Sequence, residues 1–314
     1  MIDWVEVPFE VQKPQDGLRV DAYLARRLHR YSRNTVQKLI GGGHVCVAGR
    51  TVKPATRVNA GQTVIVRYPR RAEPAASAAR LAVIYEDDWL LAVDKPGHVL
   101  SHPTDKIVQN TVTTILKKQF PGQTLHLAHR LDRETSGVLL LAKDPATTQL
   151  LTAAFFARDV RKKYVALVAG HVAWARKTVD APIGREGGHI LVRQAVGSGQ
   201  PAVTLFERLA HGEEASLVAA RPRTGRLHQI RVHLASLGHP IIGDKLYTRD
   251  GELYMKAVRQ ELTPGELAAP RQMLHARELK LSHPITGQSL CLRALLPDDF
   301  RAGLVAAGIE HNDA

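Results

Sequence analysis

Hydrophobic positions in the first part of the chain predict two short helices that lead into a small sheet. Val20, Leu24 and Leu28 recur every four positions, as one face of a helix requires. Ser32 is expected to cap a second helix, which ends at the glycines at 41–43. The apolar face of the second helix and the strand positions that follow are Val36, Leu39, Ile40, Val45, Val47 and the run TVIVRY after Gly61.

A change of pattern near residue 80 predicts two folded units. The stretch PRRAEPAASAA is rich in proline and alanine and has no apolar periodicity, which indicates a linker. Beyond it, short strand-like runs outnumber the helices expected at 111–119, 145–157 and 227–237, and this favours an α+β fold over a regular βαβ repeat. The expected segments are an extension at 1–17, a small unit at 18–68, a linker at 69–79, a large unit at 80–302 and a polar tail at 303–314.

Positive charge is concentrated in the small unit. The formal net charge of +13 favours a polyanionic partner but by itself indicates only non-specific attraction. Between Leu18 and Arg71, twelve Lys and Arg residues face a single acid, Asp21. We interpret this excess as a phosphate-binding surface and regard a merely solvated surface as the weaker reading. The positions predicted to contact the phosphates of this partner are Arg26, Arg27, Arg33, Lys38, Arg50 and Lys53.

Composition disfavours several other classes of protein. Cys46 and Cys291 are far apart and outside any metal-like spacing, so neither a disulfide framework nor a cysteine-based zinc site is expected. No basic head precedes an apolar run at the start, and no stretch approaches ~18 consecutive apolar residues. Phosphate-loop and dinucleotide glycine patterns are also missing from the sequence. We therefore expect a cytoplasmic protein without metal, organic cofactor or membrane contact.

The segment HRLDRETSGVLLLAK contains the highest concentration of candidate catalytic side chains. If its first residues are extended, Arg130 and Asp132 share one face while His129 and Leu131 share the other. The TSG that follows predicts a turn, and the leucine run predicts a buried strand. A carboxylate and an arginine would then lie together beside a core strand, where catalytic groups are often placed. We predict that His129 lies close to the bound polyanionic partner.

A second candidate segment is TGRLHQIRVHLASLGHP, whose leucines follow helical spacing. Arg231 falls on the apolar side of this helix, because its neighbours four positions before it and three and four positions after it are apolar. A guanidinium there needs a desolvated anionic partner. Asp132 is the preferred partner, since the pair would keep the carboxylate ionised and oriented. Asp244 is the alternative.

A third candidate segment is RKKYVALVAG, in which Tyr164 opens a strand behind three bases. A phenol ring can stack on a nucleobase and can also handle a proton. Taken alone, such a tyrosine is more often a half-buried strand aromatic. The order of the neighbouring motifs favours the functional reading.

Together these segments resemble the RluA family of pseudouridine synthases. The motifs are HRLDRETSG, KKYVALVAG and GRLHQIRVHLASLGHPIIGDKLY, preceded by YEDDWLLAVDKPGHVLSHPT and followed by LHARELKLSHPITG. LRVDAYLARRL, SRNTVQKLIGGGHVCVAGRTVKP and AGQTV similarly resemble the α-L RNA-binding domain, first described in a small-subunit ribosomal protein. The resemblance implies a mixed, mainly antiparallel central sheet in an α+β synthase domain, behind a small α/β RNA-binding domain.

The resemblance also implies roles for single residues. Asp132 matches the catalytic aspartate, Tyr164 the active-site tyrosine and Arg231 the arginine that pairs with the aspartate. Arg130 matches the residue that holds the RNA while the target base is out of the stack, and Ile230 matches an apolar position near the uracil.

The implied reaction converts uridine into pseudouridine in structured RNA and needs no cofactor. Asp132 would act as a nucleophile or as a base that starts elimination, and Tyr164 would remove the C5 proton or only position the ring. Large-subunit (23S) ribosomal RNA is the expected substrate, and the enzyme is expected to be a monomer. The alternatives are a transfer-RNA-directed synthase and a non-catalytic RNA-binding or ribosome-assembly protein. Glycoside hydrolysis is disfavoured, because Asp132 and Glu134 lie only two positions apart in one loop.

Overall fold

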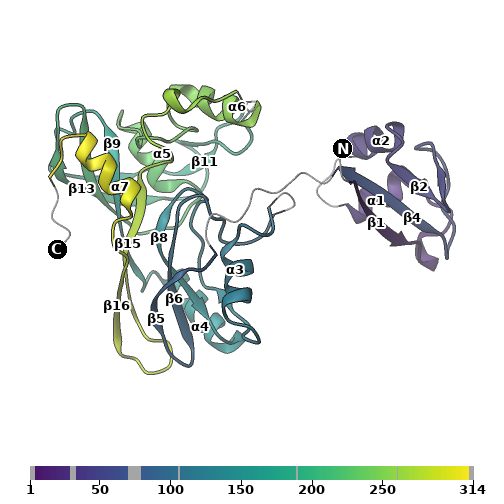
Figure 1. Cartoon of the computed structure of the whole chain (residues 1–314), viewed down its shortest axis with the longest axis horizontal. Coiled ribbons are helices and arrows are strands. Elements are labelled where there is room, and N and C mark those ends of the chain that lie inside the picture. The colour runs from purple at the N-terminus through teal and green to yellow at the C-terminus, as the bar shows by residue number, and fades with distance from the viewer. Residues whose placement is uncertain are drawn as a thin grey trace. The chain divides into compact units, whose positions relative to one another are not determined.

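The chain folds into two compact units, Met1–Ala72 and Glu73–Ala314, each with its own hydrophobic core (Figure 1). This computed structural model describes residues 4–28, 33–69, 79–104, 107–188, 190–259 and 261–310. Ser32 and most of the predicted linker lie outside the described residues. Within the described ranges, no helix has the length and apolar character needed to cross a membrane.

The first unit packs two helices on a four-stranded sheet. Val20, Leu24, Val36 and Ile40 are buried, which confirms the two apolar helix faces predicted from periodicity. The elements in chain order are β1 (Trp4–Glu10), the 3-10 helix η1 (Lys13–Gln15), α1 (Val20–Arg27), α2 (Arg33–Gly41), β2 (Val45–Val47), β3 (Arg50–Thr51) and β4 (Thr63–Pro69). The strand order in the sheet is β1-β4-β2-β3.

The amino-terminal residues are part of the first unit, and the predicted extension at 1–17 is wrong. β1 pairs antiparallel with β4 along its whole length, and Phe9 and Val11 pack into the core of the unit. The signal was present in the sequence, because Val7, Phe9 and Val11 alternate with Pro8 and other non-core positions. The early acids and the proline obscured this alternation.

A ten-stranded sheet organises the second unit (Figure 1). The strands in spatial order are β10 (Arg176–Asp180), β13 (Val203–His211), β14 (Ala215–Pro222), β9 (Arg161–Ala169), β15 (Leu274–Ser282), β8 (Ser136–Ala142), β6 (Leu90–Lys95) and β5 (Ala82–Glu86), with β16 (Ser289–Arg293) beside β15 and β7 (His126–Leu127) beside β8. A separate hairpin consists of β11 (Ile183–Arg185) and β12 (Gln194–Val196).

The pairing in the large sheet is antiparallel except between β15 and β8, so the predicted mixed, mainly antiparallel sheet is confirmed. Gly137 makes the parallel contact possible. Its φ is +110°, and a Cβ atom there would lie 2.2 Å from the carbonyl oxygen of Ala276. Only glycine permits so close an approach of the two strands.

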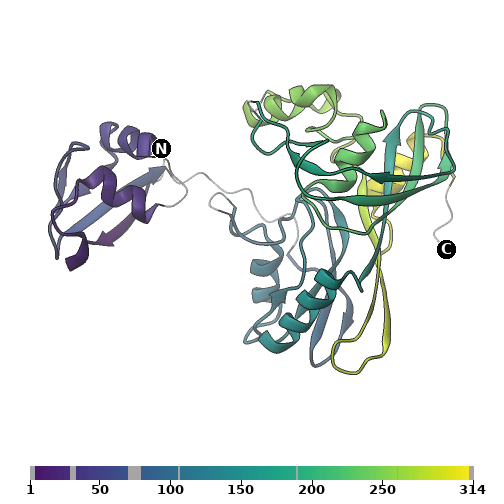
Figure 2. The same ribbon diagram turned by 180° about the vertical axis from the view of Figure 1, so that it is seen from behind.

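Helices cover both faces of the sheet (Figures 1 and 2). On the β6–β8 half, α3 (Val112–Gln119) packs with Leu91 and Leu139, while α4 (Pro145–Ala157) packs with Leu90 and Leu140. Successive strand residues point to opposite faces, so one pair of strands serves two cores. The strands themselves therefore lack a polar face, which explains their leucine-rich runs.

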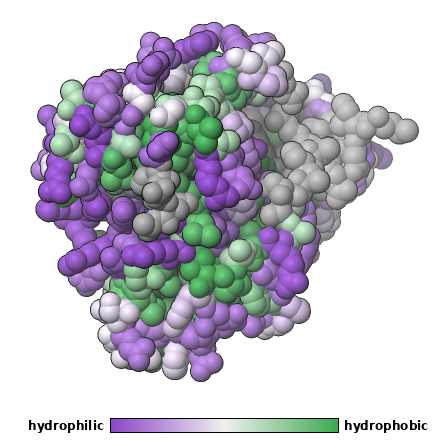
Figure 3. All heavy atoms as spheres, turned by 60° about the vertical axis from the view of Figure 1, so that its left-hand side comes forward, coloured by the Kyte–Doolittle hydropathy of each residue, from purple (hydrophilic) through white to green (hydrophobic). Residues whose placement is uncertain are grey.

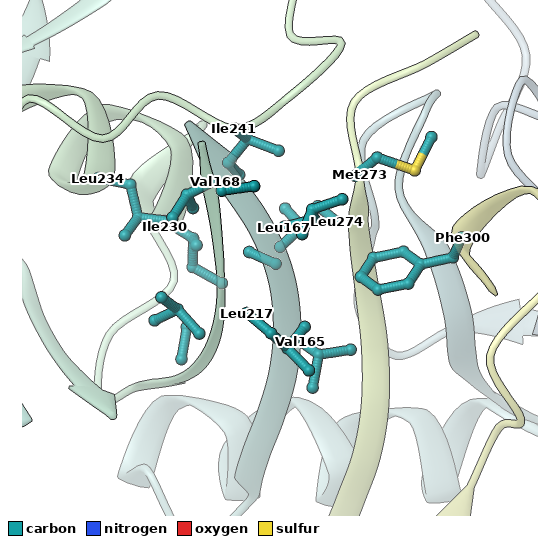
Figure 4. Close-up of a cluster of buried hydrophobic side chains, with 14 of the residues drawn as sticks. Val165, Leu167, Val168, Leu217, Ile230, Leu234, Ile241, Met273, Leu274 and Phe300 are labelled. Atoms are coloured by element: carbon teal, nitrogen blue, oxygen red, sulfur yellow. The ribbon is translucent and has the colours of Figure 1, made fainter. Parts of the chain in front are cut away.

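On the other half of the sheet, two helices flank β9. Figure 4 shows Ile230 and Leu234 of one helix on one side of β9 and Phe300 of another on the other side. The remaining helices of the unit are α5 (Gln229–Ser236), η2 (Arg249–Gly251), α6 (Glu252–Arg259), η3 (Pro264–Glu266) and α7 (Asp298–Ala306). One outer face, seen in Figure 3, carries hydrophobic side chains among more numerous hydrophilic ones.

The predicted tail from residue 303 is also wrong as far as Glu310. α7 continues to Ala306, and Leu304 and Ile309 are each only 4% exposed within the core. The small residues of this segment suggested a polar tail, but they permit close packing, as Gly303 shows against Leu167. Residues 311–314 lie outside the described part of the chain.

Candidate active site

Asp132 lies in the turn that leads into β8. Its backbone carbonyl accepts a hydrogen bond from the N–H of Thr135, so the turn spans residues 132–135. The turn was predicted at TSG, residues 135–137, but β8 already begins at Ser136. Leu131 is buried while Arg130 is exposed, as the predicted alternation requires. The side chain of Asp132 is 28% exposed, which leaves the carboxylate within reach of a ligand.

Arg231 lies between two carboxylates. Its Nη1 donates to Oδ2 of Asp132 at 2.9 Å, while its Nε and Nη2 donate to Oδ2 and Oδ1 of Asp244 at 2.7 and 2.9 Å. Asp244 is fully buried and also accepts the backbone N–H groups of Leu246 and Tyr247. Both partners considered from the sequence are present. The bidentate pair with Asp244 orients the guanidinium, and the remaining donor holds Asp132.

This arrangement keeps Asp132 charged. Burial acts to raise the pKa of Asp132, but the charge and hydrogen bond of Arg231, with smaller contributions from His228 and Gln272, outweigh it and hold the pKa below its ordinary value. For Arg231, burial opposes the charge, yet Asp244 and Asp132 raise its pKa overall. At neutral pH the site therefore presents a partly exposed carboxylate against a buried cation.

Tyr164 comes from the centre of the sheet and lies near that carboxylate. On β9 it pairs with Ala220 of β14 and Ala276 of β15. Burial, together with the negative charge of Asp132, raises the pKa of Tyr164, so its hydroxyl stays protonated at neutral pH. The hydroxyl makes no hydrogen bond within the described residues and is not among their buried unpaired atoms. It is thus open to a ligand.

The loop that carries Asp132 is held through its backbone. The Oγ atom of Ser101 donates to the carbonyl of Leu131 at 2.9 Å and accepts its N–H at 3.1 Å. The Lys95 ammonium donates to the carbonyl of Arg133 at 3.2 Å. Sequence analysis did not single out Lys95 or Ser101, although both lie in the upstream motif DKPGHVLSHPT.

Arg271 holds the same loop from the other side and was also missed. Its Nη1 donates to the carbonyl of Glu134 at 2.8 Å, and its Nη2 donates to Oγ of Ser136 at 3.1 Å. The side chain is 1% exposed and forms an ion pair with Asp299. No local pattern marks this arginine as buried, because its partners are distant in the sequence.

His228 and Tyr247 form the wall behind Arg231. The guanidinium of Arg231 lies over the Tyr247 ring, 5.1 Å from its centroid. The Tyr247 hydroxyl accepts the N–H of Gln194 and is 2.9 Å from Nδ1 of His228. Burial, aided by Arg231, lowers the pKa of His228 to about 4, so this imidazole is neutral at pH 7. Sequence analysis gave neither residue a role.

The helix that carries Arg231 begins later than predicted. His228 has a left-handed backbone with φ 56°, and α5 starts at Gln229 rather than at 227. Leu227 is 56% exposed and is not part of the apolar stripe assigned to it. Ile230, by contrast, is buried in the core, one residue before Arg231.

His129 has contacts within the larger unit, and its predicted RNA contact stays a prediction. Its Nε2 accepts the backbone N–H of Leu140 at 3.1 Å, and its ring lies 4.9 Å from that of Phe155. Burial lowers the pKa of His129 to about 3. Its side chain therefore links the segment that leads to Asp132 to β8 and α4.

The basic side chains of the first unit divide into two groups. Arg33 pairs with the buried Asp21 at 3.1 Å while staying 54% exposed, and Arg27 reaches the Glu10 carbonyl and the Gln15 side chain. The other predicted contacts are exposed and form no ion pair within the described ranges; these are Arg26, Lys38, Arg50 and Lys53.

Replacing these four unpaired residues by serine is expected to weaken RNA binding and its salt dependence. Each lost phosphate contact should reduce the slope of log K against log salt by roughly 0.7 on single strands. The measurement is a salt titration of RNA binding by wild type and by the quadruple variant. If the slope of the quadruple variant equals that of wild type, this surface does not contact RNA.

The fold and the site define an RNA-modifying enzyme, in which a paired carboxylate is partly exposed and a basic unit precedes the larger one in the chain. Residues 89–236 match the RNA pseudouridylate synthase family and residues 18–64 match the S4 domain. The chain belongs to the RluA family of RNA pseudouridine synthases. It is an isomerase that forms pseudouridine in RNA.

Relatives match along nearly the whole chain. Ribosomal large subunit pseudouridine synthase D of Pseudomonas aeruginosa is 33% identical over 302 residues, covering 94% of this chain and 92% of the relative. An uncharacterized RNA pseudouridine synthase of Bacillus subtilis is 35% identical over 272 residues, covering 83% and 89%. The solved structure of human RNA Pseudouridylate Synthase Domain Containing 4 superposes with a TM-score of 0.59 at 29% identity, covering 74% of this chain and 95% of that one.

Proposed function

We propose that this enzyme modifies uridines of large-subunit (23S) ribosomal RNA, with Asp132 as its essential carboxylate. The observation that carries the proposal is the contact of the partly exposed Asp132 carboxylate with the buried Arg231. The named function of the relative from Pseudomonas aeruginosa supports the choice of RNA. The proposal includes action in the cytoplasm as a monomer.

The target uridine has to leave its helix to reach Asp132. Flipping costs a few kcal/mol of lost stacking, which contacts with the protein have to offset. Arg130 is exposed two residues before Asp132, and in this proposal it occupies the space that the base vacates. Asp132 then acts on the sugar, as a nucleophile at C1′ or as a base that starts elimination, while the uracil turns and C5 bonds to C1′.

The test is pseudouridine mapping of RNA from cells that lack this protein. The RNA is incubated with purified enzyme, treated with carbodiimide and read by primer extension. New stops are expected in large-subunit ribosomal RNA. Stops confined to transfer RNA would show that transfer RNA, and not ribosomal RNA, is the substrate. An absence of new stops would favour a non-catalytic RNA-binding protein.

Tyr164→Phe is expected to slow the reaction less than a hundredfold and to leave RNA affinity nearly unchanged. The ring is retained, and the protonated hydroxyl favours a positioning role over proton removal. Loss of a true general base typically costs about 10²–10⁴ in rate. Single-turnover rates and binding constants are measured for both proteins. A loss in rate near ten-thousandfold would indicate that Tyr164 removes the C5 proton.

A further inference from the structure

Lys162 extends the catalytic face of β9. It lies two residues before Tyr164 on the same strand, so both side chains project from one face of the sheet. Its Nζ donates to the backbone carbonyl of Thr224 at 3.3 Å, in the loop between β14 and α5. The adjacent Gly225 has no side chain to cover the ammonium, and a Cβ there would lie 3.8 Å from Nζ. Lys162 thus lies between β9 and the loop that leads to Arg231.

The charge of Lys162 has no protein counterion in the described part of the chain. An ammonium offers three donors, and the carbonyl of Thr224 uses one of them. Lys245, in contrast, pairs with Glu134 at 2.8 Å. Burial lowers the pKa of Lys162, and no acid opposes that effect. A partly buried cation without an anion is costly.

The other charged groups around Lys162 do not compensate for it. His129 is neutral at pH 7, because burial lowers its pKa to about 3. Arg226 of the same loop adds positive charge, and its guanidinium is engaged with the Pro201 carbonyl and the Gln200 side chain. The charge of Lys162 is therefore left without an anion from the protein, and a bound substrate can supply one.

We propose that the Lys162 ammonium binds a backbone phosphate flanking the target uridine. The inference rests on the proposed function, since it requires the uridine to lie at Asp132 and Tyr164. Residues two apart on a strand are separated by about 7 Å, so β9 contacts the uridine at Tyr164 and its sugar–phosphate backbone at Lys162. Lys162 is then a positioning residue, because it fixes the nucleotide without acting on the bonds that change.

The test uses a stem-loop transcript that the wild-type enzyme modifies. Lys162→Met is expected to weaken RNA binding about tenfold or more and to lower the salt slope by roughly 0.7, with little change in rate at saturating RNA. Lys162→Arg should retain most of the affinity. Lys162→Gln keeps a donor for the Thr224 carbonyl but lacks the charge, and it should bind as weakly as Lys162→Met. Lys163→Met, on the opposite face of β9, is the matched control and should bind like wild type.

The contact is then assigned with chemically altered RNA. A neutral methylphosphonate is placed at each of the two linkages flanking the target uridine in turn. At one of these linkages, the methylphosphonate should weaken RNA binding by wild type as much as the Lys162→Met substitution does. The affinity of Lys162→Met itself should not change at that linkage. Equal losses for both proteins at both linkages, or full rescue by Lys162→Gln, would overturn the inference and leave Lys162 a structural residue.

The failure of this inference and that of the proposed function have different signatures. Wild-type activity with unchanged binding by Lys162→Met overturns the inference alone. Absence of pseudouridine after incubation with wild type overturns the proposed function and the inference with it. Melting temperatures of all variants are compared, so that a loss of fold is not mistaken for a loss of contact.

Discussion

Asp132→Asn is expected to abolish pseudouridine formation while RNA binding persists. The amide keeps the shape of the side chain and an oxygen that accepts the N–H of Arg231, but it has no negative charge. Because the carboxylate is the proposed reacting group, a loss of at least about a thousandfold in rate is expected. Arg231 keeps its bidentate pair with Asp244, so the fold should be retained.

The measurement for Asp132→Asn is a single-turnover assay on a transcript that wild type modifies, with binding measured in parallel. Asp88→Asn is the matched control, since Asp88 is an exposed acid on the turn between β5 and β6. Activity of Asp132→Asn within tenfold of wild type would exclude this carboxylate as the essential group.

Arg231→Met is expected to lose both activity and stability. The substitution leaves Asp132 and the fully buried Asp244 without their cation. Removing one partner of a buried ion pair typically costs about 3–5 kcal/mol of unfolding free energy. Urea denaturation at pH 7 measures the loss. The double variant Arg231→Met/Asp244→Asn should recover part of the stability and none of the activity, and equal stability of wild type and Arg231→Met would contradict the structural role.

The same variant should change the pH dependence. In wild type, the pKa of Asp132 lies below its ordinary value, so its contribution to stability is fully present above the unfolded pKa of about 3.9 and is lost as pH falls through the lower folded pKa. Without Arg231, burial dominates and the pKa rises. Any residual activity of Arg231→Met should therefore fall with decreasing pH in a range where the wild-type rate is constant.

Patterns of a few residues were sufficient for much of the fold. Apolar periodicity indicated α1 and α2, the helices predicted at 111–119 and 145–157 match α3 and α4 within a residue, and the leucine-rich run of β8 was predicted as a buried strand. The prediction from sequence failed where local patterns were ambiguous. β1 was hidden by acids, and α7 by small residues that resemble a polar tail. The start of α5 was misjudged because the left-handed His228 interrupts an otherwise regular spacing.

The candidate site was predicted unevenly for the same reason. The burial of Arg231 followed from its apolar neighbours, and its need for an anion followed from the cost of burying a charge. The contact of His129 with the Leu140 backbone was not predicted, because it depends on how the chain returns beside β8. Arg271, Ser101 and Lys95 hold the loop of Asp132 through backbone carbonyl groups, which carry no sequence signature.

The sequence by itself determined which residues can react, since charge, aromatic character and local periodicity are properties of short segments. Only the tertiary structure decided which of them meet. Asp132 and Arg231 are 99 positions apart, and their contact requires β9 to pair between β14 and β15 while β8 joins the same sheet. The sharing of Arg231 between two acids, and the uncompensated charge of Lys162 beside Tyr164, depend on that pairing, because electrostatic and hydrogen-bond energies are set by distances in space rather than along the chain.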